Sequence, residues 1–102
     1  MDILSKIKRL TIARKLIFTR KAENERLLDG LTIDDIIESI ARSTAIKKTI
    51  RSTSRGRRLK KEKLYIIESP NLSGTWIYTK GTIRKTRIGE TFYILVSSKI
   101  SN

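Results

Sequence analysis

The residues best suited to chemistry in this 102-residue chain are basic ones, and many of them form a short run. Residues 55–63 hold Arg55, Arg57, Arg58, Lys60, Lys61 and Lys63, interrupted by one acid. Guanidinium groups bind phosphate oxygens in pairs, and ammonium groups attract them as point charges. The run therefore predicts contacts with phosphates, with a merely solvated loop as the alternative. The phosphate contacts we expect are Arg51, Arg55, Arg57, Arg58, Lys60, Lys61 and Arg84.

The residue types that are missing limit the chemistry as much as those present. The chain has no cysteine and no histidine. It therefore has no disulfide, no thiolate zinc site and no Ser-His or Cys-His arrangement. If the protein is an enzyme, it works with Lys, Arg, Tyr, Asp or Glu, and we expect neither a metal of its own nor a small-molecule cofactor.

The net charge of +13 is concentrated in the second part of the chain. Residues 1–43 carry 9 bases and 7 acids, whereas residues 44–102 carry 14 bases and 3 acids, a net of +11. Such a field favours a polyanionic partner, because each neutralised phosphate releases counterions. Nucleic acid is the first expectation, an anionic membrane the second and an acidic protein the third.

Helical periodicity dominates the first half of the chain. We expect a helix over residues 2–10, a brief strand over 15–19 and a helix over 20–29, with Thr19 as N-cap and Gly30 as the left-handed stop. The clearest element is a helix over 33–43, preceded by a capping arrangement of Thr32 and Asp35. Its apolar stripe consists of Ile33, Ile36, Ile37 and Ile40.

From residue 44 onward the pattern is typical of strands and turns. Residues 44–53 predict a strand or an irregular extension, and residues 52–62 predict a flexible basic loop. A strand over 63–68 ends near Pro70, and segments 75–85 and 91–99 form a hairpin around a glycine-containing connection. The sequence therefore predicts a single α+β domain over 1–102, with N-terminal helices packed on a small antiparallel sheet of about three strands.

Alternation along the hairpin sorts its residues into two faces. Trp76, Tyr78 and Lys80 share one face of the first strand, and Ile77 lies on the other. One face is then core, and the other can present Tyr78 together with Lys99, if the unknown register allows it.

The order of these segments resembles the MqsR family of toxins from toxin–antitoxin pairs, small ribonucleases with a RelE-like fold. The similar segments begin with FTRKAENERLLDGLTIDDIIESI, a strand, helix, Gly-Leu and acid-capped helix in succession. They continue with IKKTIRSTS and LYIIESP, where the family has a strand closing on a proline. They end with GTWIYTKGTI and YILVSSK, where the family has Val-Tyr-Leu-Lys and Val-Ser-Phe-Lys or Val-Ser-Phe-His. The resemblance covers about residues 3–100.

The resemblance implies a catalytic set of three residues: Lys48, Tyr78 and Lys99. It also shows two departures, since Tyr65 stands near a family glutamine and the loop at 53–61 is longer and more basic. Without the family, each residue has an ordinary alternative: Lys48 as a solvated charge, Tyr78 as a sheet-packing aromatic and Lys99 as a solubilising edge residue.

Histidine-free RNA cleavage is chemically feasible with these residue types. Attack by the 2'-hydroxyl needs a base, an acid and positive charge on the phosphorane. Lys48 or Lys99 can act as acid, base or charge clamp, and Tyr78 can position the hydroxyl or shuttle its proton. Other aromatic side chains can stack on unpaired bases, although we expect core packing for each of them: Tyr65, Trp76 and Tyr93.

Three functions follow from these observations. The first is a metal-independent endoribonuclease toxin that cleaves mRNA and is inhibited by an antitoxin protein. The second is a noncatalytic RNA- or DNA-binding module, and the third is a toxin of the same fold that inhibits a protein target. No apolar run approaches the roughly 20 residues that span a bilayer, and lysines and arginines interrupt the first 18 residues. We therefore expect a cytoplasmic protein that does not bind membranes.

Overall fold

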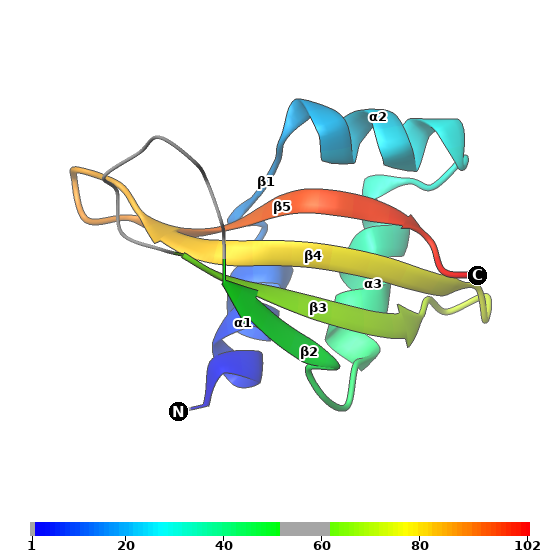
Figure 1. Cartoon of the computed structure of the whole chain (residues 1–102), viewed down its shortest axis with the longest axis horizontal. Helices are drawn as coiled ribbons and strands as arrows, with labels where there is room; N and C mark the ends of the chain where they lie inside the picture. Colours follow the sequence, from blue (N-terminus) through cyan, green and yellow to red (C-terminus); the bar gives the residue numbers. More distant parts are fainter. Residues whose placement is uncertain (1, 52–61) are drawn as a thin grey trace.

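The structure, a computed structural model, describes residues 2–51 and 62–102. Within these ranges the chain forms three helices and five strands, which confirms the α+β class (Figure 1). The helices are α1 (Ile3–Ile12), α2 (Arg20–Leu28) and α3 (Ile33–Arg42). The strands are β1 (Leu16–Phe18), β2 (Lys48–Arg51), β3 (Lys63–Pro70), β4 (Trp76–Lys85) and β5 (Thr91–Ile100). The predicted basic loop, except for its last residue, lies outside the described residues.

The strands form one sheet in the order β1-β5-β4-β3-β2. Strands β3, β4 and β5 pair antiparallel as predicted, and β2 adds antiparallel to β3. Strand β1, however, pairs parallel with β5, so the sheet is mixed. The expected antiparallel sheet of about three strands is therefore wrong in the number of strands, which is five, and in the direction of β1. The local pattern of a three-residue strand contains no information about its partner, because that pairing depends on residues more than seventy positions away.

Helices α2 and α3 begin at the predicted capping residues, Thr19 and Thr32, and α1 begins at Asp2, a cap that was not predicted. The Asp2 carboxylate accepts a hydrogen bond from the Ser5 amide, and Thr19 does the same for Ala22. Thr32 and Asp35 form a complete capping box, each side chain accepting from the backbone amide of the other. Gly30 ends the α2 region with φ +71°, a conformation that costs glycine little.

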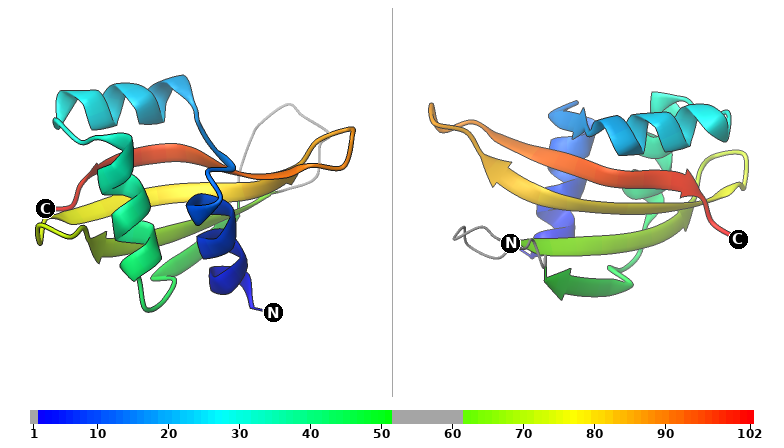
Figure 2. Two further views of the ribbon diagram at one scale, coloured as in Figure 1. Left: turned by 180° about the vertical axis from the view of Figure 1, so that it is seen from behind. Right: turned by 45° about the horizontal axis from the view of Figure 1, so that its top comes forward.

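Helices α1 and α3 cover one face of the sheet, and the core lies between these layers (Figure 2). The centre of the core is fully buried and consists of Ile7, Ala22, Ile36, Ile40, Ile67, Ile77, Tyr93 and Leu95. The predicted stripe of α3 is confirmed at Ile36 and Ile40. Ile33, the first member of the stripe, is instead 41% exposed.

Helix α2 lies along the outer edge of β5, beyond the short strand β1 (Figure 1). Its carboxylates accept hydrogen bonds from the edge of β5: Glu25 from the Ser98 amide and Asp29 from the Ile100 amide. Glu25 also accepts from the Ser97 hydroxyl at 2.7 Å. The helix thus satisfies backbone groups that would otherwise offer an open sheet edge.

Among the helices of residues 2–51 and 62–102, none combines the length and the hydrophobicity that a membrane-spanning helix needs.

Candidate nucleic-acid interface

The face of the sheet opposite α1 and α3 carries all three predicted catalytic residues, and two of them, Tyr78 and Lys99, lie in contact. On β4, Ile77 and Thr79 are fully buried on the face that the helices cover. Alternation therefore places Trp76, Tyr78 and Lys80 on the other face. Lys99 of β5 pairs directly with Tyr78, and its ammonium nitrogen lies 5.4 Å from the centre of the Tyr78 ring. The structure thus brings Tyr78 and Lys99 together.

A β-bulge in β5 produces this juxtaposition. Lys80 pairs with Ser97 and Gly81 pairs with Leu95, so Val96 is an extra residue on β5. Without it, simple alternation would place Lys99 on the same face as the buried Tyr93 and Leu95. The bulge reverses the alternation, and Lys99 joins Tyr78 on the face that no helix of the described residues covers, the uncovered sheet face.

Glu68 flanks Tyr78 on the side away from Lys99. It pairs with Tyr78 across β3 and β4, accepts a hydrogen bond from the Lys47 ammonium at 2.6 Å and accepts another from the Ser101 hydroxyl. The hydrogen bond from Lys47 is the main cause that lowers the pKa of Glu68, against a smaller opposing effect of desolvation. Glu68 is therefore ionised at neutral pH and can accept hydrogen bonds but not donate a proton.

Lys48 lies on the same face, farther from Tyr78. It pairs with Ile66 on β3, which pairs in turn with Lys80 on β4, so the three side chains form a row across the sheet. Strands about 4.8 Å apart and a rise of about 3.4 Å per residue put the Cα atoms of Lys48 and Tyr78 roughly 12 Å apart. Lys48 is exposed and shares the surface with the pair without contacting it.

The two other described phosphate candidates have different environments. Arg51 follows Lys48 by three positions on β2, so its side chain projects from the opposite face of the sheet. Arg84 forms two hydrogen bonds to the Glu62 carboxylate, at 2.8 and 2.9 Å, and the side-chain hydrogen bond is the main cause that raises the pKa of Arg84. Its guanidinium would have to exchange this partner for a phosphate. The remaining candidates, Arg55, Arg57, Arg58, Lys60 and Lys61, lie outside the described residues.

Core packing is confirmed for two of the three aromatics for which we expected it. Tyr65 is 8% exposed and Tyr93 is fully buried, so the residue near the family glutamine faces the core. Burial also raises the pKa of Tyr93, and the nearby Tyr65 adds to the effect. Trp76 is 55% exposed, so core packing is wrong for this residue.

Three residues of this face were not among the predicted site residues: Lys80, Glu68 and Trp76, the last of which was expected in the core. Lys80 was detectable, since it follows Tyr78 by two positions in a strand, but the resemblance gives it no role. Glu68 was not detectable, because its place beside Tyr78 depends on the register of β3 and β4. We define the sheet-face site as Lys48, Glu68, Trp76, Tyr78, Lys80 and Lys99.

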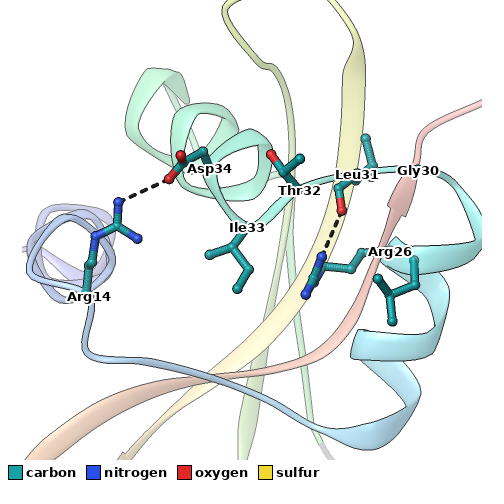
Figure 3. A pocket seen from close by; sticks show the side chains of 8 residues that line it. Arg14, Arg26, Gly30, Leu31, Thr32, Ile33 and Asp34 are labelled. Atoms are coloured by element: carbon teal, nitrogen blue, oxygen red, sulfur yellow. Dashed lines mark hydrogen bonds and ion pairs between the residues drawn. The ribbon is translucent and has the colours of Figure 1, made fainter.

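A separate hollow opens between the end of α1 and the connection from α2 to α3 (Figure 3). Its two arginines already have partners. Arg14 binds Asp34 at 3.0 Å, while Arg26 binds Glu23 and donates to the Leu31 carbonyl at 2.9 Å. Satisfied charges of this kind stabilise the connection between helices, so the hollow offers less chemistry than the sheet-face site.

Within residues 2–51 and 62–102, no three acidic side chains gather into a possible metal site. Comparison of the chain with protein-family models, curated proteins and solved structures found no match in any of the three.

Proposed function

We propose that this protein is an endoribonuclease toxin of the MqsR type, with a RelE-like fold, and that it cleaves RNA on the uncovered sheet face. The observation that carries the proposal is the pairing of Tyr78 with Lys99 at 5.4 Å on that face. The positive charge of residues 44–102 adds the attraction that a polyanionic substrate requires.

The proposed reaction is attack of a 2'-hydroxyl oxygen on the adjacent phosphorus. The bond from phosphorus to the 5'-oxygen breaks, and the products are a 2',3'-cyclic phosphate and a 5'-hydroxyl. Tyr78 holds the 2'-hydroxyl in line with the phosphate and relays the proton of that hydroxyl to solvent water as the oxygen attacks. The Lys99 ammonium stabilises the negative charge of the phosphorane and donates a proton to the departing 5'-oxygen.

The other lysines of the sheet-face site have a binding role in this proposal. Lys80 lies two positions along β4 from Tyr78, and Lys48 lies two strands away, at a distance suited to a neighbouring phosphate. Each adds electrostatic affinity without touching the reacting atoms. An antitoxin protein whose acidic or apolar segment covers this face would then inhibit cleavage.

The test is incubation of the purified protein with a long single-stranded RNA in EDTA, followed by mapping of the cut ends. We expect discrete cuts from the wild type that end in a cyclic phosphate. Tyr78→Phe keeps the ring beside Lys99 but removes the hydroxyl, and Lys99→Ala removes the charge. Each is expected to lower the cleavage rate by roughly 100-fold or more, the usual effect of losing a proton-transfer or charge-stabilising group.

Matched controls distinguish the effect of losing a site residue from the general effect of removing the same chemical group elsewhere. Tyr93→Phe also removes one phenolic hydroxyl, but from the buried face, and Lys6→Ala removes one positive charge from α1. Both controls should cleave at the wild-type rate. RNA that is retarded but uncut by all five proteins would overturn the nuclease proposal in favour of a noncatalytic binder. RNA that is neither cut nor bound would favour a protein target.

A further inference from the structure

Trp76 is an exposed aromatic side chain on a firmly held backbone. Its carbonyl accepts a hydrogen bond from the Ser101 amide at 2.9 Å, and on the other side it pairs with Pro70 of β3. The strand at this point is thus fixed on both sides, while 55% of the residue remains open to solvent. A fixed backbone with an exposed indole is a preorganised surface for a flat ligand.

The neighbours of Trp76 are suited to a nucleotide. Tyr78 projects from the same face two positions along β4, about 7 Å away between Cα atoms. Lys99 lies over Tyr78, and Lys80 follows at the next position of the face. Aromatic rings that lie beside cations on one sheet face provide stacking surface and phosphate attraction together.

We propose that Trp76 stacks on an unpaired base of the RNA, so that the substrate is single-stranded at the site of cleavage. The proposal deepens the proposed function and depends on it for the identity of the polyanion. A base can expose its face to an indole only when it is not stacked within a helix, and this requirement excludes an intact duplex. Trp76 is then a specificity-determining residue, and Tyr78 with Lys99 remain the reacting pair.

The charge of the surrounding face favours RNA over a protein as the occupant. Three lysines of the sheet-face site accompany the indole, and Glu68, the one acid of that site, is already bound to Lys47. A protein partner would need a dense acidic surface to match this face, whereas every nucleotide brings its own phosphate. Binding of a protein partner at Trp76 is the alternative that the test can reveal.

Trp76 is the single tryptophan of the chain, so its fluorescence reports on this position alone. The probe is a short 2'-O-methyl RNA strand, which lacks the attacking hydroxyl and stays intact on the wild-type protein. We expect this strand to quench the fluorescence of Trp76 strongly, and the quenching should saturate when all of the protein is bound. Inorganic polyphosphate, which has charge but no bases, should bind without comparable quenching, and so should a duplex of the same RNA sequence. Absence of quenching by the bound single strand, or equal quenching by polyphosphate, would overturn the proposal.

Substitutions provide a second, independent measurement. Trp76→Ala should weaken binding of the single strand by roughly 5- to 150-fold, the range expected from loss of one base-stacking contact. Trp76→Phe should recover part of this loss, and polyphosphate binding should change little in either variant. Leu28→Ala is the matched control, since Leu28 is 87% exposed on α2 and its loss should leave binding unchanged. A Trp76→Ala variant that binds RNA as the wild type does would contradict stacking and leave the indole to a protein partner.

The two proposals can fail separately. Quenching by single-stranded RNA without cleavage by the wild type would support stacking and contradict the nuclease. Cleavage that depends on Tyr78 and Lys99, without quenching of Trp76, would support the nuclease and contradict stacking.

Discussion

At the scale of single residues, the packing beneath the sheet-face site depends on Gly81. A Cβ atom at this position would lie 2.7 Å from the Tyr93 ring and 2.8 Å from the Ile94 carbonyl oxygen. The ring is fully buried and the carbonyl is backbone, so neither can move away cheaply. We predict that Gly81→Ala lowers the free energy of unfolding by roughly 1–3 kcal/mol, the usual cost of overpacking a core. Urea unfolding followed by circular dichroism measures it.

Tyr93→Phe is the informative companion to this variant. The Tyr93 hydroxyl is buried and has no hydrogen-bond partner among the described residues. Its removal should leave the free energy of unfolding unchanged or raise it, because an unsatisfied buried polar group is destabilising. A wild-type unfolding midpoint for Gly81→Ala would contradict the close packing of the Tyr93 ring on Gly81, and a large loss of stability for Tyr93→Phe would mean that the Tyr93 hydroxyl has a hydrogen-bond partner.

At the scale of elements, α2 is bound to β5 through carboxylates, and its docking should therefore depend on pH. Burial raises the pKa of Glu25, but hydrogen bonds from Ser97, Lys21 and the Ser98 amide together outweigh this effect and lower it below 4.5. A lowered pKa in the folded state stabilises the protein above about pH 4.5, and the contribution is lost as the pH falls through the folded value. We predict that Glu25→Gln reduces stability at pH 7 and makes it less sensitive to acid.

Urea unfolding between pH 7 and pH 3 measures this effect. Glu90→Gln, in the connection between β4 and β5, is the matched control and should retain the wild-type dependence on pH. The free energies of unfolding of Glu25→Gln and Glu90→Gln should therefore differ at pH 7 and approach each other in acid. Equal acid sensitivity of Glu25→Gln and the wild type would show that Glu25 does not link α2 to the edge of β5.

The elements that were predictable are those specified by nearby residues. The stripe of α3 and the caps at Thr19 and Thr32 depend on positions within one or two turns, so the sequence located the helices to within about two residues. Alternation likewise grouped Trp76 with Tyr78. The pairing of β1 with β5 and the bulge at Val96 depend on contacts between distant segments, and no local pattern contains them.

In the candidate site, too, some features depend on nearby residues and others on contacts between distant segments. Tyr78 and Lys99 were each named through the resemblance, but their contact requires a bulge that strict alternation does not predict. Glu68 could not be assigned without the register, and the exposure of Trp76 could not be judged without knowing that the helices cover the opposite face. Local sequence thus identified chemically suitable residues, while tertiary pairing decided which of them meet.

At the scale of the whole molecule, the net positive charge is large enough to bind RNA without a defined site. A measurement must therefore distinguish binding by the net charge from binding on the uncovered sheet face. Neutralising a phosphate contact on single-stranded nucleic acid contributes about 0.7 to the slope of log affinity against log salt. We predict that the triple variant Lys48→Ala, Lys80→Ala and Lys99→Ala binds the 2'-O-methyl strand more weakly and reduces this slope by about 2. Titrations at several salt concentrations measure it.

The control removes the same charge from elsewhere, by the substitutions Lys6→Ala, Lys8→Ala and Arg20→Ala on α1 and α2. If RNA lies on the uncovered sheet face, this variant should weaken the affinity slightly through the long-range field and leave the slope near its wild-type value. The distinction follows from the physics of screening, since charges farther than about 10 Å from a phosphate are largely screened at 0.1 M salt. Equal slopes for the two triple variants would mean that the strand is bound by the net charge without a defined face. That result would contradict both the sheet-face site and stacking on Trp76.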